Sequence, residues 1–473
     1  MVQTDCTATQ FEFQGLGRRQ VVACFNGGRL TSDAGVLLLR EAAERTGLVR
    51  RFAQCFTDHR DPTRTEHTVA ELVAQRVLAL ACGYEDLNDH DVLRDDALLA
   101  VAAGKTDATG ATRARARDRG HALAGKSTLN RLERTRADAT AATRYAKIVY
   151  DAAAIEGFFV AAFLAAHATP PAEIVLDLDA TDDPLHGQQE GRFFHGYYRA
   201  YCYLPLYIFC GDPLLGAKLR RADGDGAAGA VDELARIVAQ IRTRWPQVRI
   251  VVRGDSGFAR EALMAWCEAQ GVDYVLGVAR NARLEAAIAD ELAQARAQHA
   301  ATGTAARVFK DFTYQTRATW TRARRVVGKA EYLPGKANPR FIVTSLPAAR
   351  WAAAALYEEL YCARGDMENR IKEQQLGLFA DRTSTATMRA NQLRLWFSSV
   401  AYVLVETVRR VGLAGTELAR AQVATIRTRL FKLAGLVRVS VRRVTLALSS
   451  VFPLQRLFAQ ALANLQRTFP LRC

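Results

Sequence analysis

The stretch from residue 173 to residue 279 alternates short β-prone runs with amphipathic helices, and this alternation most constrains the fold. The predicted strands cover residues 173–181, two runs within 193–211, 213–220, 248–258 and 273–279. The predicted helices cover residues 231–244 and 260–271, the first with an apolar face of Leu234, Ile237, Val238 and Ile241. Strands and helices in this order predict an α/β layer.

The segments on either side of this layer are predicted to be mainly helical. Thr68 and Glu71 form a capping box, which predicts the start of a helix that Gly83 ends. Short alternating runs between about 281 and 348 predict a small β insertion. Helices are expected again from residue 349 to the end of the chain.

The charge of the chain is strongly basic and unevenly distributed. Lys and Arg number 64 against 49 Asp and Glu, a net charge of +15. Residues 401–473 contain twelve Lys and Arg against only Glu406 and Glu417, and a second basic run covers 113–119. Clustered basic residues favour a polyanionic partner such as nucleic acid. The alternative is a solvated basic surface in a protein that uses arginine freely.

No part of the sequence predicts a membrane segment. The most apolar stretch, residues 393–408, carries Arg394 and Glu406, which favours a buried helix. Nine cysteines are scattered without a C-x-x-C pair, as expected for free thiols in a reducing compartment. We therefore expect a cytoplasmic protein.

Residues 120–128, GHALAGKST, match the phosphate-loop pattern G-x-x-x-x-G-K-[ST]. A phosphate loop requires a buried strand before it, but residues 111–120 contain four arginines and no apolar run. We therefore expect an ordinary helix here, with Ser127 or Thr128 as its N-cap and Lys126 on the surface or on a DNA phosphate. A nucleotide hydrolase remains the third functional hypothesis.

Two predicted strands end in aspartates. Asp177 and Asp179 share one face of the first strand, and Asp179 is nearer its end. Asp255 follows the apolar run of another strand, after Arg253 and Gly254. Open α/β sheets place their sites at the carboxyl ends of strands, although a single such acid is more often a cap or turn residue.

A third acid lies on a predicted helix. One polar stripe of this helix contains Tyr361, Arg364, Glu368, Lys372 and Gln375. The alternative interpretation of the stripe is an exposed, salt-bridged helix face. Together with the strand-end acids, Glu368 suggests a site for two Mg²⁺ ions, for which Mn²⁺ is expected to substitute. On a basic chain, such a site is suited to cleaving a nucleic-acid phosphodiester.

The sequence resembles the DDE transposases of bacterial insertion sequences, most closely the thirteen-eighty family. The resemblance covers nearly the whole chain. It is carried by GGRLTSDAGVLLLRE, QRVLALACGYEDLNDHDVLRDD, LDLDATDDPLHGQQEGRFFHGYY, RGDSGF and RGDMENRIKEQQLGLFADRTS. It implies an RNase H-like mixed-sheet catalytic core with a β-rich insertion, flanked by helical N-terminal and C-terminal regions.

The resemblance also assigns residues. It implies that Asp179, Asp255 and Glu368 are the catalytic, metal-binding acids, with Asp177 as the alternative first acid. We expect Tyr361, Arg364, Lys372 and Arg253 to contact DNA or its phosphates. Tyr361, Arg364 and Glu368 match the spacing of a signature in related hairpin-forming transposases. Its lysine position holds Gln375, which leaves open whether Lys372 substitutes and whether a hairpin forms.

We therefore predict a cut-and-paste transposase that binds terminal inverted repeats, cleaves there and joins the freed 3′-OH to target DNA. The alternative is a catalytically silent DNA-binding protein derived from such an enzyme. The predicted partners are double-stranded DNA and a second copy of the chain, in a homodimer on DNA.

The predicted regions have distinct tasks. They are an Arg-rich, helical DNA-binding region (1–165), the two parts of the catalytic core (166–280 and 349–410), the β-rich insertion between them (281–348) and a basic helical C-terminal region (411–473). In the last region, Leu430, Leu433, Val437 and Val441 form an apolar helical stripe. This stripe was expected either to hold two subunits together or to pack on its own core.

Overall fold

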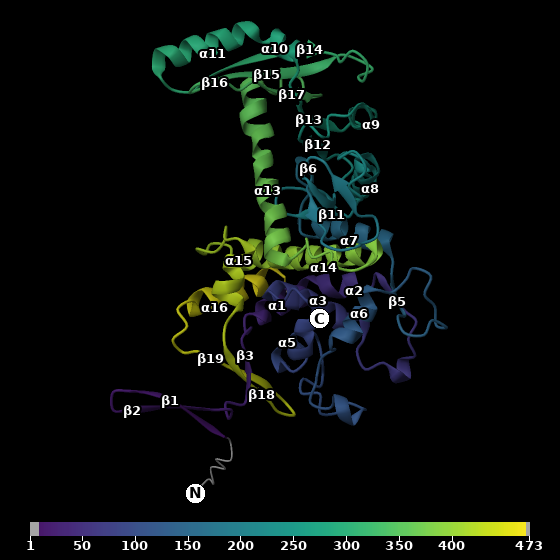
Figure 1. The fold of residues 1–473 in the computed structure, drawn as a ribbon, viewed down its shortest axis with the longest axis vertical. Helices are drawn as coiled ribbons and strands as arrows, with labels where there is room; N and C mark the ends of the chain where they lie inside the picture. The colour runs from purple at the N-terminus through teal and green to yellow at the C-terminus, as the bar shows by residue number, and fades with distance from the viewer. Residues whose placement is uncertain (1–8, 470–473) are drawn as a thin grey trace. The chain divides into compact units, whose positions relative to one another are not determined.

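The computed structural model describes residues 9–469 and divides into two compact units (Figure 1). Met1–Tyr150 and Val400–Cys473 form the first, which we call the terminal unit. Asp151–Ser399 form the second, the central unit. Helix α14 (Met388–Thr407) begins in the central unit and ends in the terminal unit.

The central unit is built on a nine-stranded mixed sheet with the order β11-β10-β6-β12-β13-β17-β15-β14, in which β16 pairs with β15. Neighbours β6, β12 and β13 are parallel, and the other pairs are antiparallel. The strands are β6 (Glu173–Ala180), β10 (Leu206–Phe209), β11 (Leu214–Lys218), β12 (Arg249–Gly254), β13 (Asp273–Val278), β14 (Ala306–Tyr314), β15 (Arg324–Leu333), β16 (Lys336–Ala337) and β17 (Arg340–Thr344). A small separate sheet contains β7 (Asp183–Pro184), β8 (Phe193–His195) and β9 (Ala200–Tyr203).

Helices cover both faces of the large sheet. On one face Ile250 and Val252 belong to the same core as the inward side chains of α8 and α9. On the other face Val251 packs with Leu356 and Leu360, from the helical stretch that leads into α13 (Figure 1). The helices of this unit are α7 (Ala152–Ala165), α8 (Ala230–Arg244), α9 (Glu261–Gln270), α10 (Ala282–Ala287), α11 (Ala289–Thr302), α12 (Ala353–Ala355) and α13 (Gly365–Lys372).

The stretch from α12 to residue 377 stays helical but changes its winding. It passes through a π-helical segment (Leu356–Tyr361), a 3₁₀ turn (Cys362–Arg364), α13 and a second π-helical segment (Glu373–Gly377). π-Helical turns are rare and frequently lie at functional sites.

The segment predicted as a β insertion is part of the main sheet. It starts with α10 and α11, and its strands β14, β15 and β17 extend the sheet through the pairing of β17 with β13. Residues 281–348, predicted as a β-rich insertion, therefore contain four strands, and these strands continue the large sheet.

The terminal unit combines short helices with four small strand pairings. Its helices are α1 (Val36–Thr46), α2 (Leu48–Ala53), α3 (Val69–Cys82), α4 (His90–Leu93), α5 (Ala97–Ala102), α6 (Lys126–Glu133), α15 (Val423–Ile426) and α16 (Gln455–Thr468). Short 3₁₀ turns cover Pro62–Arg64, Leu87–Asp89 and Ala116–Asp118, and π-helical segments cover Val408–Gly412 and Arg427–Phe431. Its strands are β1 (Gln10–Leu16), β2 (Arg19–Cys24), β3 (Arg29–Thr31), β4 (Phe56–Asp58), β5 (Ile148–Tyr150), β18 (Gly435–Val439) and β19 (Val444–Leu448).

The predicted capping box of the terminal unit is confirmed. The backbone N–H of Glu71 donates to the Thr68 hydroxyl, and the Glu71 carboxylate accepts from the Thr68 N–H. Gly83 ends α3 with a φ of 98°, a conformation that glycine adopts without strain.

The C-terminal region is not all helical, contrary to the prediction. Strand β18 pairs with β19 and with β3 from the other end of the chain. Leu430, Leu433 and Val437 are buried in this unit, whereas Val441 is fully exposed. The apolar stripe therefore packs largely on its own core, which was the alternative interpretation, and does not form a surface for a second subunit.

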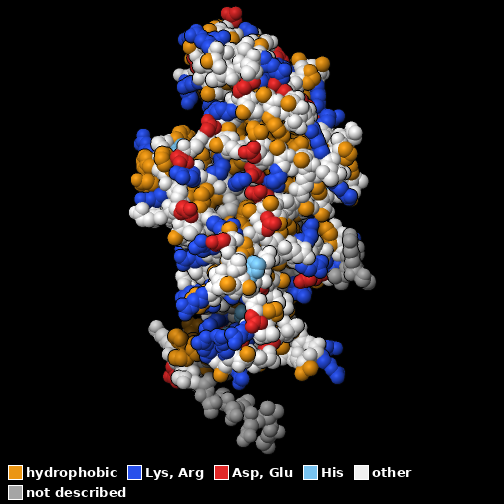
Figure 2. Space-filling model, turned by 90° about the vertical axis from the view of Figure 1, so that its right-hand side faces the viewer, with side chains coloured by type: hydrophobic (Ala, Val, Ile, Leu, Met, Phe, Trp, Pro, Cys, Tyr) orange, Lys and Arg blue, Asp and Glu red, His pale blue; other side chains and the backbone are white. Residues whose placement is uncertain are grey.

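Several basic residues of the C-terminal region are already paired within the terminal unit. Arg410 pairs with Glu406, Arg429 with Glu417, and Lys432 with Asp33 at 2.7 Å. In Figure 2, Lys and Arg side chains are spread over the face shown, with acidic side chains among them. The count of basic residues alone thus overstates the charge available to a polyanion. Within residues 9–469 no helix has the length and apolar character needed to cross a membrane.

Candidate active site

Parallel strands bring Asp179 and Asp255 to the same edge of the central sheet. In the register of β6 and β12, Leu178 lies opposite Gly254, and each aspartate is the next residue along its strand. Backbone N–H groups fix both carboxylates, from Ala180 to Asp179 at 2.9 Å and from Gly257 to Asp255 at 2.8 Å. The sequence-predicted strand ends are therefore adjacent in space.

Arg364 connects the strand edge to Glu368 on α13. Its guanidinium donates to the Glu368 carboxylate at 2.9 Å and lies 3.7 Å from an oxygen of Asp179. The predicted polar stripe thus faces the predicted aspartates. Arg364 and Glu368 also form the i,i+4 pair of the alternative interpretation, but the contact with Asp179 makes this pair part of the site.

The other two acids of the site oppose the ionisation of Asp179. The pKa of Asp179 is raised to about 6. Burial is the largest cause, and the negative charges of Asp255 and Glu368 also raise this pKa, whereas Arg364 lowers it. Burial lowers the pKa of Arg364, but its acidic neighbours outweigh this effect and the pKa is raised, so Arg364 stays charged. A carboxylate perturbed by burial and by two other acids is typical of a functional site.

Asp177 and Arg253 are buried together beneath this edge. Arg253 donates to both carboxylate oxygens of Asp177, one at 2.7 Å, and to the carbonyl oxygen of Leu360. This position differs from the surface position that the predicted DNA contact of Arg253 requires. It also makes Asp177 a partner of Arg253 rather than an acid open to a ligand. The pair joins β6 and β12 to the π-helical segment that precedes Arg364.

Tyr361 lies close to β13, the strand that pairs with β12. A Cβ atom on Gly277 would lie 2.6 Å from the Tyr361 hydroxyl oxygen and 2.9 Å from the backbone nitrogen of Ser256. Glycine in a strand often marks such a close approach. Burial raises the pKa of Tyr361, and Arg364 partly offsets this effect.

Lys372 and Gln375 differ in whether their side chains are free to contact a phosphate. The Gln375 amide donates to the carbonyl oxygen of Asp182 at 3.1 Å and is thus bound to the segment after β6. Lys372 is exposed and forms no ion pair with any residue in 9–469. Lys372 is therefore the cation of the stripe that is free to meet a phosphate.

A cavity of about 340 Å³ adjoins Asp255 and Tyr361. Arg280 and Arg340 line it, and the pairing of Val278 with Phe341 places them side by side. Both are exposed, and neither forms an ion pair within the described part of the chain. The sequence interpretation missed both arginines. The available signal was that Arg280 follows the third parallel strand and so lies at the same edge as the aspartates.

The donor atoms at this edge suit a hard divalent cation, since Mg²⁺ prefers carboxylate oxygens. In residues 9–469, however, no three metal-ligating side chains converge on one point. The Arg364 guanidinium lies instead between Asp179 and Glu368. The residues fit a metal in chemistry, and a metal there would have to replace the contacts of Arg364.

The phosphate-loop match lacks the required structure. No strand precedes it among residues 111–119, and α6 starts after Gly125 rather than at the predicted cap, Ser127 or Thr128. The Asp91 carboxylate accepts from the Lys126 backbone N–H at 3.0 Å and pairs with its ammonium group at 3.1 Å. A carboxylate therefore occupies the position where a nucleotide phosphate would bind.

Comparison with known proteins gives a family assignment over almost the entire chain. The family model described as "Transposase DDE domain group 1" matches residues 13–470. The chain is also similar to the solved structure described as "Cryo-EM structure of piggyBac transposase synaptic complex with hairpin DNA". That similarity has a TM-score of 0.42 at 12% identity and covers 85% of this chain and 80% of that one. None of the curated proteins matches.

Proposed function

The chain belongs to the transposase DDE domain family, group 1, and from this premise we propose that it catalyses cut-and-paste DNA transposition. In this proposal it binds the terminal inverted repeats of its element, hydrolyses a strand at each end and joins the freed 3′-OH to target DNA. The observation that carries the proposal is the meeting of Asp179, Asp255 and Glu368 around Arg364 at one sheet edge.

We assign Asp179, Asp255 and Glu368 as the ligands of the divalent ions. Two such ions, when bound, activate the attacking water and stabilise the leaving oxygen of a phosphodiester. Mg²⁺ is the expected ion and Mn²⁺ the expected substitute. Asp255 accepts one backbone hydrogen bond and Asp179 another, so the protein holds both carboxylates in defined orientations.

We assign the substrate contacts to the cations that line this edge. Arg280 and Arg340 open into the cavity beside Asp255, and Lys372 is exposed on the helix that carries Glu368. Arginine binds phosphate oxygens through two parallel N–H groups, which also orients the scissile bond. Arg364 contacts the phosphate when it leaves its carboxylate partners, and Tyr361 supports the loop of Asp255.

The proposed core is RNase H-like. The order β11-β10-β6-β12-β13 supports this assignment, because an antiparallel run of three strands continues into parallel strands that carry the first two acids. A homodimer on DNA is also proposed, because two element ends must be joined to one target.

The test is a cleavage assay on linear DNA that carries the sequences flanking the gene, with Mg²⁺ and without nucleotide. The wild-type protein should nick this DNA, and Asp255→Ala and Glu368→Gln should abolish nicking while DNA retention stays near wild type. Glu359→Gln is the matched control, because Glu359 lies exposed on the same helical stretch and forms no ion pair with any residue in 9–469.

Three outcomes would overturn the proposal. Nicking by Asp255→Ala at the wild-type rate would remove the site assignment. DNA retention without any nicking by the wild-type protein would support the silent DNA-binding protein. A strict requirement for ATP would support the nucleotide hydrolase.

A further inference from the structure

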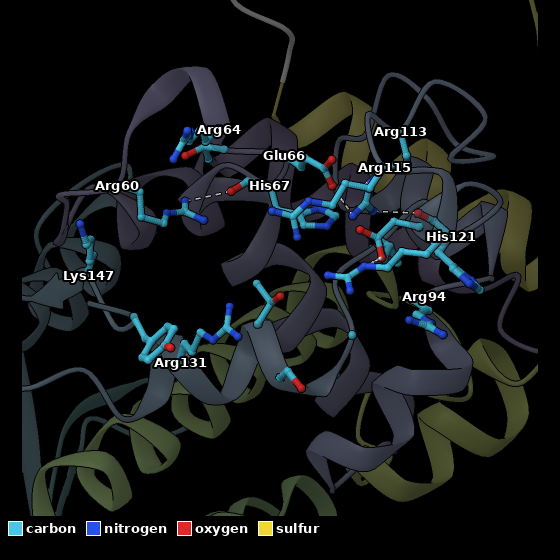
Figure 3. Close-up of a pocket in the computed structure, with 18 of the residues that line it drawn as sticks. Arg60, Arg64, Glu66, His67, Arg94, Arg113, Arg115, His121, Arg131 and Lys147 are labelled. Carbon is cyan, nitrogen blue, oxygen red and sulfur yellow. Dashed lines mark hydrogen bonds and ion pairs between the residues drawn. The ribbon is translucent and has the colours of Figure 1, made fainter. Parts of the chain in front are cut away.

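The terminal unit contains a basic cavity that the proposed cleavage reaction does not use (Figure 3). Its volume is about 800 Å³. Nine Lys and Arg side chains line it against four acidic ones, as follows: Arg60, Arg64, Arg94, Arg113, Arg115, Arg117, Arg131, Arg144 and Lys147 against Asp61, Glu66, Asp91 and Asp118. A concave surface with this excess of positive charge favours an anionic ligand.

Part of the positive charge of the cavity is not held in ion pairs between described residues. Arg113 is paired with Glu66 at 2.7 Å and Arg60 with Asp58 at 2.7 Å, so these two are largely satisfied. Five others form no ion pair among the described residues, namely Arg94, Arg115, Arg131, Arg144 and Lys147. Cations held close together repel one another, and an anionic ligand would relieve this repulsion.

An exposed aromatic side chain stands among these cations. Tyr145 is 60% exposed, and the guanidinium groups of Arg144 and Arg131 lie 4.8 Å and 5.8 Å from its ring centre. Aromatic rings and guanidinium planes are the surfaces on which unstacked nucleobases pack. The Arg144–Tyr145–Arg131 group thus combines an aromatic ring with two guanidinium groups close to it.

The cavity continues into a small recess with an apolar floor. This recess of about 70 Å³ is bounded by Leu132 and Ile148, both buried, together with Tyr145, Arg131 and Lys147. A site for inorganic phosphate alone would have no use for an apolar recess beside an aromatic ring. Cations beside an aromatic ring and a small apolar recess match a nucleotide better than a phosphate alone.

We propose that this cavity binds unpaired nucleotides of DNA, with a base packed against the Arg144–Tyr145–Arg131 group. A base pair inside a duplex hides the faces of its bases, and a convex element rather than a cavity enters a DNA groove. The hydroxyl groups of Ser127 and Thr128, which also line the cavity, supply further donors to a phosphate. This proposal rests on the proposed transposase function only in naming DNA as the ligand.

The test measures binding of a short fluorescent DNA single strand, and of the blunt duplex of the same sequence, by anisotropy without divalent metal. Tyr145→Ala should weaken single-strand binding roughly tenfold, since stacking on one aromatic ring is worth about 1–3 kcal/mol per base. Tyr145→Phe, which keeps the ring, should bind like the wild type. Duplex binding should stay within about twofold in both variants, because phosphate contacts dominate duplex affinity.

Arg131→Ala and Arg136→Ala form a matched pair. Arg131 lines the cavity and pairs with no acidic residue in the described part of the chain, whereas Arg136 is exposed five residues later and pairs with Asp138 at 2.8 Å. Only Arg131→Ala should weaken single-strand binding, and circular dichroism should show that both variants are folded. Equal losses on single strand and duplex, or no loss in Tyr145→Ala, would overturn the proposal. Unlabelled RNA and unlabelled DNA of the same sequence should also be compared as competitors of the labelled DNA strand. If a lower concentration of RNA than of DNA displaces the labelled strand, the assignment to DNA is overturned.

The binding assay uses no metal and detects no cleavage. A protein that fails to nick DNA but binds single strands through Tyr145 would contradict the proposed function and leave this inference standing. A protein that nicks DNA but binds single strands equally well in Tyr145→Ala would do the reverse.

Discussion

Folding makes the Asp179 carboxyl group harder to ionise than the carboxyl group of an aspartate in an unfolded chain. Its side chain is mostly buried, and Asp255 and Glu368 add to the effect of burial. In an unfolded chain an aspartate releases its proton near pH 3.9, whereas the folded protein holds this proton up to a pKa of about 6. The folded state therefore binds more protons between these values, and the free energy of unfolding falls as the pH rises through this window.

Asp179→Asn should consequently stabilise the metal-free protein at pH 7.5. The gain is at most roughly 3 kcal/mol, at about 1.4 kcal/mol per pK unit, and loss of the Arg364 contact reduces it. Thermal unfolding should show a higher midpoint for Asp179→Asn at pH 7.5 and equal midpoints near pH 4. The control Glu359→Gln should match the wild type at both pH values. A lower midpoint for Asp179→Asn at pH 7.5 would contradict the assigned charge state.

Cleavage should depend on pH through the same group. A metal ion binds the ionised carboxylate, so at limiting Mg²⁺ the rate should fall as the pH drops below the Asp179 pKa of about 6. The expected loss is roughly tenfold per pH unit. The measurement is initial nicking rate from pH 5 to pH 8, with DNA binding followed in parallel as a control. A rate that stays constant between pH 5 and pH 7 would contradict the role of Asp179.

At the scale of elements, Gly277 in β13 allows Tyr361 and the loop of Asp255 to approach each other. Gly277→Ala would place a methyl group against the Tyr361 hydroxyl oxygen and the backbone of Ser256, where backbone atoms have to move. We expect at least a tenfold lower nicking rate with near-normal DNA retention. Gly196→Ala is the control, because a Cβ atom at Gly196 meets nothing within 4 Å. Wild-type nicking by Gly277→Ala would show that this contact does not support the site.

The hairpin of β18 and β19 should contribute to duplex binding. Arg438, Arg442 and Arg443 are exposed around its turn and form no ion pair in the part of the chain that the structure describes. Replacing all three by Gln should lower the slope of log affinity against log salt by about 2.7, at about 0.9 per phosphate contact. Measuring the duplex affinity at salt concentrations from about 50 to about 200 mM gives this slope. An unchanged slope would place the duplex contacts elsewhere.

Local signals predicted some elements correctly and missed others. The capping box and apolar face identified α3 and α8, because both signals act within a few residues of each other. The C-terminal strands were missed because Leu430, Leu433, Val437 and Val441 fit a helical period. Val437, Val439 and Val441 fit a period of two equally well. Pairing of β18 with β3, far away in sequence, decides between the two patterns.

In the candidate site, too, features that depend on neighbouring residues were predictable, and features that depend on distant segments were not. The nearness of Asp179 and Asp255 was predictable because Asp179 lies near the end of β6 and Asp255 directly follows β12. Arg280 and Arg340 were not, because they meet only through the register of β13 with β17. The burial of Arg253 could not be predicted either, since its partner Leu360 lies on an element more than a hundred residues later.

At the scale of the whole molecule, the two ends of the chain form one unit. Strand β3 pairs with β18, and the backbone N–H of Ala34 donates to the Leu433 carbonyl at 2.8 Å. A Cβ atom on Gly35 would lie 2.1 Å from the carbonyl oxygen of Leu430, so these segments are tightly packed. The predicted C-terminal region is therefore not a separable tail.

Truncation after Gly415 should accordingly unfold the terminal unit. It removes β18, β19 and α16, and with α16 the carbonyl of Phe469 that Arg45 contacts. Urea unfolding should show a lower midpoint, and binding of even a single DNA end should be lost. Variants at exposed residues of the tail, such as Arg456→Ala, should unfold like the wild type. Single-end binding by the truncated chain would contradict this packing.

This arrangement has a consequence for the order of events during synthesis. On the ribosome, Asp151–Ser399 are complete while Val400–Cys473 have still to be made. Domains generally fold as units as the chain emerges, so the part with the three acids can fold first. The N-terminal segment, although translated earliest, must wait for its C-terminal partner strand. A nascent or prematurely terminated chain would thus carry the proposed nuclease residues without the basic unit that we expect to direct them to DNA.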